Sequence, residues 1–186
     1  MKKRILEAAV KEIELHGASF RMDDLAKRLN ISKRTLYENF YSKNEIIGKI
    51  VVERAHEYHQ LHHDILADES LGFEEKLRKY FTKLDVNNTI RGDQYRVMFA
   101  AIPSLIEQVE RVMEDDWNEL EAFLKQQIEL GVCRPFNAQV LVGMLKSIVQ
   151  TVFRDTNRNP EYCFELFGDI VDIVLHGILN EEASNE

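Results

Sequence analysis

The chain has 186 residues, of which 45% are hydrophobic and 30% charged, and this composition excludes a disordered tail and suffices for one large or two small folded units. No apolar run is long enough to cross a membrane, and Cys133 and Cys163 have no partners at metal-binding or redox spacing. The sequence therefore predicts an unprocessed cytoplasmic protein with reduced cysteines and no membrane contact.

The formal net charge of −8 is unevenly distributed along the chain. Residues 1–50 carry 11 Lys and Arg against 7 Asp and Glu, a net charge of +4, and the remaining residues carry 13 against 25, a net charge of −12. A basic module on an acidic body is typical of a protein in which one part meets phosphate groups while the other repels them. The charge pattern therefore favours a nucleic-acid-binding N-terminal part.

The first helix is predicted at residues 2–16, where apolar side chains recur at helical spacing and Gly17 is placed to end the helix. A short second helix follows. Asp23 and Asp24 give it an acidic first turn, and Asn30 ends it.

A third helix begins after Ser32, which can cap it, and its residues Leu36 and Phe40 can face back onto the preceding short helix. The pattern predicts a helix-turn-helix that binds DNA, whereas the alternative is a small three-helix core with ordinary surface charges. The outer face then carries residue types that contact base edges and phosphates, namely Lys33, Arg34, Tyr37 and Glu38, with Thr35 and Asn39 at its flanks.

A fourth, longer helix is predicted to start after Ser42, because Ser42 and Glu45 have the spacing of a capping box ahead of an apolar run. Lys43 lies at its N-terminus, where free backbone N–H groups and a lysine suit a phosphate oxygen. The helix is expected to continue to about Leu66, which is too long for a small domain alone. We therefore expect it to bridge two domains.

A specific motif runs through this region: Ile31-Ser32-x-x-Thr35-Leu36-Tyr37-x-x-Phe40-x-x-Lys43. Together with Gly17 and the triplet Asp24-Leu25-Ala26, it resembles the DNA-binding domain of tetracycline-repressor (TetR/AcrR) family transcriptional regulators. The resemblance covers roughly the first quarter of the chain. It implies a three-helix DNA-binding domain followed by a helical body.

The resemblance implies that Lys33, Thr35, Tyr37, Asn39 and Lys43 lie at or near DNA. The chain departs from the family pattern at two places: Arg34 replaces the usual Gly, and Arg21 and Met22 replace a common Thr or Ser. The full set of predicted DNA-binding residues is Arg21, Lys33, Arg34, Thr35, Tyr37, Asn39 and Lys43.

The rest of the chain has helical periodicity and no strand-like alternation. Helices are predicted around residues 73–84 and 95–102, from Pro103 to Gly131, and at residues 138–153 and 162–179. The predicted fold is all-α, with a helix-turn-helix DNA-binding domain at residues 1–47 and a helical ligand-binding and dimerisation domain at residues 48–186.

The last two predicted helices are apolar on more than one face. They could form the middle of a larger monomeric core, or their surplus face could pack on a second copy as a four-helix dimer interface. The family resemblance favours the homodimer. The residues predicted to form the interface are Leu141, Leu145, Ile148, Phe167, Ile170, Val174 and Ile178.

Aromatic residues of the body are candidates for a ligand site, although such residues more often form a plain core. The ligand hypothesis depends on the predicted two-domain organisation, because a DNA-binding protein with a separate helical body often binds a small molecule in that body. The candidate ligand-binding residues are Tyr80, Tyr95, Phe99, Trp117, Phe123 and Phe153.

Two polar clusters contain residue types that can bind a metal ion. The histidines His56, His59, His62 and His63 lie within eight residues, but a di-metal bundle needs a second such motif, so a solvated helix segment is favoured. The acidic residues Asp115, Asp116 and Glu119 resemble a magnesium site only loosely and are expected on the wet face of a helix. We therefore predict no metal, no cofactor and no enzyme activity.

The sequence thus predicts a homodimeric transcriptional regulator that binds double-stranded DNA at a pseudo-palindromic operator. Its simplest form is a repressor that an unknown small-molecule effector releases from the operator. The alternative is a helical DNA-binding regulator that is controlled by protein contact without a small-molecule ligand.

Overall fold

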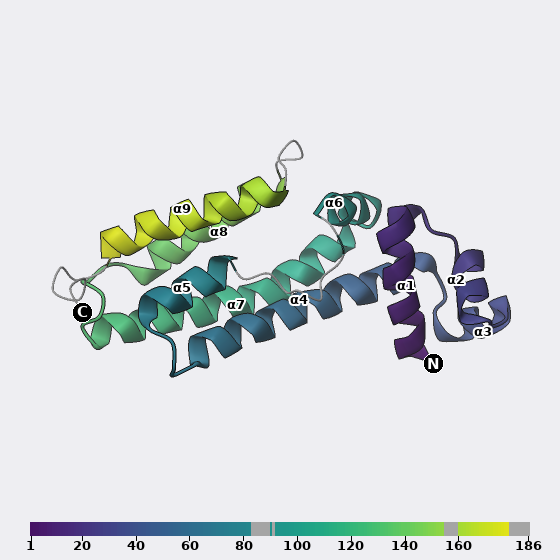
Figure 1. Cartoon of the computed structure of the whole chain (residues 1–186), viewed down its shortest axis with the longest axis horizontal. Coiled ribbons are helices and arrows are strands. Elements are labelled where there is room, and N and C mark those ends of the chain that lie inside the picture. Colours follow the sequence, from purple (N-terminus) through teal and green to yellow (C-terminus); the bar gives the residue numbers. More distant parts are fainter. Residues whose placement is uncertain (83–89, 91, 155–159, 179–186) are drawn as a thin grey trace. The chain divides into compact units, whose positions relative to one another are not determined.

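A computed structural model describes residues 1–82, 90, 92–154 and 160–178, and the side chains of residues 92–93, 96, 152–154 and 160–165 lie outside this description. Every element in the described ranges is a helix, as Figure 1 shows, and the predicted all-α class is confirmed. The elements are α1 (Lys2–His16), η1 (Gly17–Ser19), α2 (Met22–Leu29), α3 (Lys33–Asn39), α4 (Lys43–Ala67), α5 (Phe73–Thr82), α6 (Gly92–Ala101), α7 (Ser104–Glu129), α8 (Ala138–Arg154) and α9 (Pro160–Ile178).

The chain divides into two compact units. Unit 1 consists of Met1–Glu57 and Val86–Val112, and unit 2 consists of Tyr58–Asp85 and Met113–Glu186. The helices α4 and α7 contribute residues to both units. The predicted functional boundary after residue 47 stays a prediction, because compactness alone does not assign a function.

The ends of the first helices follow from local chemistry. Gly17 ends α1 with a φ of 59°, and Asn30 ends α2 with a φ of 53°, both in the left-handed region that Gly and Asn tolerate best. The Ser32 hydroxyl accepts a hydrogen bond from the Thr35 N–H at 3.0 Å and so caps α3. The helix ends predicted at Gly17, Asn30 and Ser32 are confirmed.

The interior of unit 1 is apolar and fixes the orientation of α3. Leu36 is fully buried and Phe40 is buried, and both belong to the same cluster as Leu25 of α2. The inward face predicted for α3 is therefore confirmed. In α6, Gln94 is buried and donates its side-chain amide to the Ile13 carbonyl at the end of α1, at 2.7 Å.

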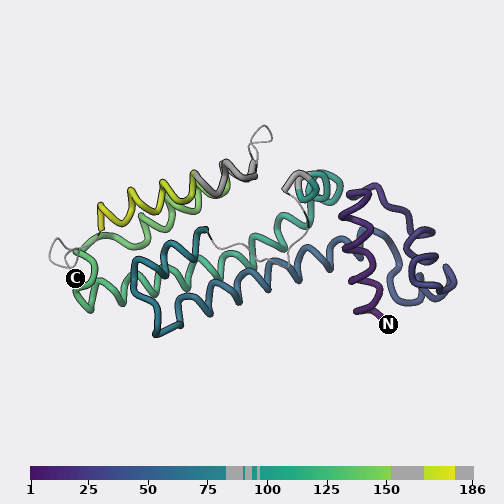
Figure 2. The backbone as a smooth tube through the Cα atoms, viewed as in Figure 1, coloured from purple at the N-terminus to yellow at the C-terminus, as the bar shows by residue number. Residues whose placement is uncertain are grey.

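Unit 2 has a separate interior built by side chains of α5, α7, α8 and α9, whose backbones Figure 2 traces. Leu120, Leu124 and Leu175 are almost completely buried there. On the surface, Arg78 of α5 forms an ion pair with Asp172 of α9 at 2.5 Å. Long apolar side chains therefore fill most of this interior.

The described part of the chain has no helix that is both long and apolar enough to cross a membrane. Cys133 is buried, and burial raises the pKa of its thiol to about 11, so the group stays protonated at neutral pH. Cys133 is thus the packing residue that its sequence context predicts, whereas the side chain of Cys163 lies outside the described residues.

Candidate functional site

The outer face of α3 presents polar side chains to solvent because the inner face is anchored in the interior. Because Leu36 is buried, Arg34, Tyr37 and Glu38 point outward. The Arg34 side chain is 89% exposed and Tyr37 is 50% exposed. A cation, a phenol and a carboxylate therefore share one accessible surface on a short helix, and Lys33 at the start of α3 is 64% exposed.

The cations on this face are paired with carboxylates of the same chain. Lys33 Nζ lies 2.7 Å from Asp23 Oδ2 of α2, and Arg34 Nε donates to Glu38 Oε1 at 2.9 Å. The hydrogen bond that Lys33 donates to Asp23, followed by the negative charge of Asp23, raises the pKa of Lys33. Because exposed pairs contribute little stability, phosphate or base groups could replace these carboxylate partners at small free-energy cost.

Lys43 lies at the N-terminus of α4, as predicted, but its ammonium group also has a partner inside the chain. Its Nζ donates to the Ala18 carbonyl at 2.8 Å and lies 5.7 Å from the centroid of the Phe20 ring. An ammonium group has three donors, so this contact leaves capacity for a phosphate oxygen. The Glu45 N–H donates to Ser42 Oγ at 3.1 Å, which is one half of the predicted capping box, whereas the Glu45 carboxylate accepts from the Tyr41 N–H at 2.7 Å.

The remaining predicted DNA contacts have different surroundings. Thr35 Oγ1 lies 2.9 Å from Ser32 Oγ, and Asn39 donates its amide to the Thr35 carbonyl at 2.8 Å, so both help to hold the ends of α3. Arg21 is exposed just before α2. Sequence reasoning overlooked Tyr41, which is 78% exposed directly after the buried Phe40.

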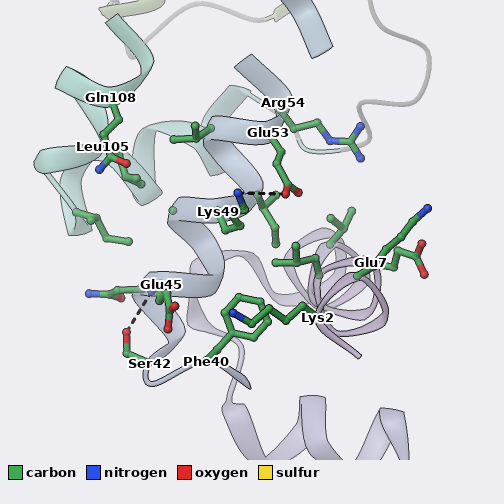
Figure 3. Close-up of a pocket in the computed structure, with 18 of the residues that line it drawn as sticks. Lys2, Glu7, Phe40, Ser42, Glu45, Lys49, Glu53, Arg54, Leu105 and Gln108 are labelled. Carbon is green, nitrogen blue, oxygen red and sulfur yellow. Dashed lines mark hydrogen bonds and ion pairs between the residues drawn. The ribbon is translucent and has the colours of Figure 1, made fainter. Parts of the chain in front are cut away.

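Unit 1 also contains an open groove of about 1460 Å³ beside α1, α4 and the start of α7 (Figure 3). Its walls carry charges of both signs. Lys2 Nζ lies 5.7 Å from the centroid of the Phe40 ring, and Lys49 pairs with Glu53 at 3.6 Å. None of the predicted DNA-binding or ligand-binding residues lines this groove.

The predicted ligand-binding aromatics do not form one group. Tyr80 and Trp117 are buried in the interior of unit 2, where Phe123 stacks on Phe73 with ring centroids 5.9 Å apart. Tyr95 and Phe99 instead pack against the interior of unit 1. The side chain of the sixth candidate, Phe153, lies outside the described residues.

A buried polar cluster in unit 2 joins three helices. Nδ1 of His62 in α4 lies 3.0 and 2.9 Å from the two carboxylate oxygens of Asp116 in α7, and the Tyr80 hydroxyl of α5 donates to Asp116 Oδ2 at 2.9 Å. His62 is 4% exposed and Asp116 is 1% exposed. The His62 ring lies between Tyr80 and Tyr58, with centroids 3.8 and 4.3 Å away.

This cluster corrects two expectations from the sequence. The sequence predicts a solvent-exposed segment from His56 to His63 and a solvent-exposed Asp116. Both His62 and Asp116 are instead buried. The reason is that α4 and α7 turn these two side chains toward each other, so that His62 Nδ1 and the Asp116 carboxylate are hydrogen-bonded to each other. Outside the cluster, His59 and His63 contact Glu119 at 3.3 and 2.5 Å. Among the described residues, no three potential ligands are placed to hold a metal ion.

The tyrosines of this cluster predict a loss of stability at alkaline pH. Burial and then the charge of Asp116 raise the pKa of Tyr58 to about 12, and the same causes raise that of Tyr80 well above 10. The unfolded chain therefore loses these protons near pH 10, while the folded protein keeps them to a higher pH. The stabilising contribution is fully present below pH 10 and falls between pH 10 and about 12, by roughly 2–3 kcal/mol for Tyr58.

Urea unfolding at several pH values between 9 and 12 measures this loss. We expect the Tyr58→Phe variant to show a shallower decline than the wild-type protein, because phenylalanine has no proton to lose. An equal decline in both proteins would contradict the assignment to Tyr58.

The seven residues predicted at a dimer interface all pack against the interior of unit 2, with Leu145, Phe167 and Ile178 buried and Leu141, Ile148, Ile170 and Val174 partly buried. The exposed apolar residues of α8 and α9 are different. Val140 is 56% exposed, Met144 58% and Ile173 73%. These three are the large apolar side chains that α8 and α9 expose in the described part of the chain, and the predicted dimer interface stays a prediction.

Comparisons with known proteins agree with the helix-turn-helix geometry. Residues 5–50 match the family described as bacterial regulatory proteins, tetR family. The chain is 29% identical to the HTH-type transcriptional regulator YvaF of Bacillus subtilis, an alignment that covers 100% of this chain and 99% of YvaF.

Solved structures share the fold along almost the whole chain. SmeT, the repressor of the Stenotrophomonas maltophilia multidrug efflux pump SmeDEF, has a TM-score of 0.70 at 20% identity, covering 98% of this chain and 92% of SmeT. A transcriptional regulator from Cytophaga hutchinsonii has a TM-score of 0.71 at 16% identity, covering 96% and 98%. Residues 5–50 therefore match the DNA-binding domain of bacterial regulatory proteins of the tetR family, and along its whole length the chain is similar to an HTH-type transcriptional regulator.

Proposed function

We propose that the protein is a dimeric repressor that binds a pseudo-palindromic operator and is released from it by a small molecule bound in unit 2. The observation that carries the DNA-binding part is the exposed outer face of α3, with Arg34, Tyr37 and Glu38 held outward by the buried Leu36. A helix of this kind fits the major groove of B-DNA. The similarity to SmeT, a repressor by name, supports repression rather than activation.

Arg34 and Glu38 are the side chains best suited to choose a base sequence. They are one helical turn apart, and Arg34 Nε donates to Glu38 Oε1, so both side chains lie on the same side of α3. Arginine recognises guanine through O6 and N7, and glutamate accepts a hydrogen bond from cytosine N4. Glu38 also repels phosphate, so it restricts where the helix can settle on DNA.

Replacing Arg34 with Ala is expected to relax base preference, since each lost bidentate base contact is worth about 1–3 kcal/mol. Replacing Lys43 with Met should weaken binding to all sequences alike and reduce the salt slope by about one, because a phosphate contact carries no sequence information. Selection from a random DNA pool, followed by titrations at several salt concentrations, measures both effects.

The exposed Lys49, which pairs with Glu53 on α4, provides the matched control. A Lys49→Ala variant should keep both the base preference and the salt slope. If the wild-type protein has no salt-dependent affinity for any duplex, the DNA-binding proposal is wrong. If Arg34→Ala keeps the full preference of the wild type, Arg34 contacts no base.

The dimer is proposed to form through α8 and α9. Val140, Met144 and Ile173 are exposed apolar side chains on these two helices, and burying them against a second copy would remove apolar surface from water. The partly buried residues Leu141, Ile148, Ile170 and Val174 would complete the edges of that surface. A two-fold dimer presents two copies of α3, which requires half-sites about one helical turn apart, ~34 Å, or a multiple of it.

Release by a ligand is proposed to act through α4. This helix carries Lys43 in its first turn and His62 five residues before its end, so it contributes to both the DNA-binding face and the buried cluster of unit 2. A ligand that prefers a different tilt of α4 would alter the spacing of two copies of α3. A coupling of about 1–3 kcal/mol would change operator affinity roughly 5- to 150-fold, and by reciprocity the operator would weaken ligand binding equally.

A further inference from the structure

The exposed charges at the start of α3 form pairs of one hydrogen-bond donor and one acceptor. Lys33 and Arg34 are the first two residues of α3, and their side chains are 64% and 89% exposed. Their carboxylate partners Asp23 and Glu38 are 49% and 57% exposed. In a helix-turn-helix, the N-terminal residues of the recognition helix contact base edges. The side chains best placed to contact bases are therefore charged.

Arg34 keeps both terminal amino groups available in its pair with Glu38. The hydrogen bond between them uses Nε of the guanidinium group and Oε1 of the carboxylate. A guanidinium group has five N–H donors, so those on Nη1 and Nη2 remain for the O6 and N7 acceptors of guanine. Oε2 of Glu38 can accept a hydrogen bond from the N4 amino group of cytosine. The pair thus offers donors to one base of a G·C pair and an acceptor to the other.

Lys33 offers a second set of donors. Its ammonium group has three N–H donors, and Nζ contacts Asp23 Oδ2 at 2.7 Å. The other two donors match guanine O6 and N7, which lysine recognises as arginine does. In adenine the O6 acceptor is replaced by the N6 amino group, which is a donor and opposes the N–H groups of a cation. Neither Lys33 nor Arg34 therefore finds two acceptors on adenine.

The side chain of α3 best suited to adenine is bonded to the helix itself. Asparagine recognises adenine through its amide oxygen and amide nitrogen together. Asn39 is half-buried in the last position of α3, and its Nδ2 donates to the Thr35 carbonyl at 2.8 Å. The amide nitrogen therefore lies against the backbone of α3. Tyr37 has a single hydroxyl that both donates and accepts, so it does not distinguish one base pair from another.

We propose that α3 selects G·C base pairs: in each half-site, Arg34 and Glu38 contact one G·C pair and Lys33 contacts a second, whereas Asn39 supports the end of the helix and contacts no base. This inference rests on the proposed operator binding, and it adds the base composition of the operator. Exchanging Asp23 for guanine as the partner of Lys33 costs little, because exposed ion pairs contribute little stability.

Selection of bound duplexes from a random DNA pool tests this composition. We expect two positions in each half-site to be G·C, with the preference at one lost in Arg34→Ala and at the other lost in Lys33→Met. Replacing either pair by A·T should weaken wild-type binding roughly 5- to 150-fold. At the Arg34 position, 7-deazaguanine lacks only the N7 acceptor and should weaken wild-type binding about tenfold, but should not weaken binding by Arg34→Ala.

Glu38→Gln tests the acceptor, because glutamine recognises adenine rather than cytosine. We expect this variant to lose its preference for G·C over A·T at the Arg34 position and to keep it at the Lys33 position. The matched control is Glu57→Gln, which removes an equal charge from an exposed side chain of α4 and should select the wild-type sequence. Asn39→Ala should also select the wild-type sequence, even if its affinity is lower.

Three results would overturn the G·C assignment and leave operator binding intact. They are selected A·T pairs at the positions that depend on Arg34 or Lys33, full wild-type binding to the 7-deazaguanine duplex, and a changed base preference in Asn39→Ala. The modified duplex tests the unaltered protein, so this result does not depend on how a variant folds. If the wild-type protein selects no sequence and has no salt-dependent affinity for any duplex, the proposed DNA binding itself is wrong and the G·C assignment fails with it.

Discussion

Replacing Ile173 with Glu is expected to convert the dimer into monomers and to weaken operator binding by roughly 10²–10⁴-fold, because each copy of α3 would then bind its half-site alone. Ile173 is 73% exposed on α9, so the charge stays in water in the monomer and is buried only at the proposed interface. Sedimentation at micromolar concentration measures the oligomeric state, and titration with a selected operator measures the affinity.

The same substitution at Leu130 separates an interface effect from a general effect of added charge. Leu130 is 66% exposed and lies in unit 2 just beyond α7, and it belongs to neither α8 nor α9. Leu130→Glu should leave both the dimer and the operator affinity unchanged. A wild-type protein that sediments as a monomer, or an Ile173→Glu variant that remains a dimer, would contradict an interface through Ile173.

Replacing Asp116 with Ala is expected to destabilise the protein by roughly 2–6 kcal/mol, since each buried donor left without its acceptor costs about 1–3 kcal/mol. The carboxylate is 1% exposed and accepts hydrogen bonds from both His62 and Tyr80, so its loss leaves two buried donors unsatisfied. Asp116→Asn keeps an acceptor oxygen and should cost less. Urea unfolding at neutral pH measures the change in the free energy of unfolding.

The adjacent Asp115 is exposed on the same helix and supplies a matched control. Asp115→Ala should change the free energy of unfolding by no more than about 0.5 kcal/mol. In a double-mutant cycle, Tyr80→Phe should cost less in the Asp116→Ala background than in the wild type, because its acceptor has already been removed. Equal losses for Asp115→Ala and Asp116→Ala would show that the buried cluster contributes no stability.

Local signals in the sequence determined most helix positions. The cap at Ser32, the left-handed residues Gly17 and Asn30, and the capping box at Ser42 act on groups within four residues, so their effect does not depend on the rest of the fold. The apolar spacing of α3 likewise determined its outer face, because burial of Leu36 leaves only one orientation for the helix. The candidate DNA-binding surface is for these reasons largely predictable.

Tertiary structure decided which distant side chains meet. His62 and Asp116 are 54 positions apart, and each belongs to a run of polar residues that is equally compatible with a solvated helix face. Only the packing of α4, α5 and α7 turns them inward and brings Tyr80 to the same carboxylate. The sequence also did not determine which faces of α8 and α9 are buried, because this too depends on packing between distant elements. Both helices are apolar on several sides, so periodicity does not distinguish Leu145, which packs inside unit 2, from Met144, which remains exposed.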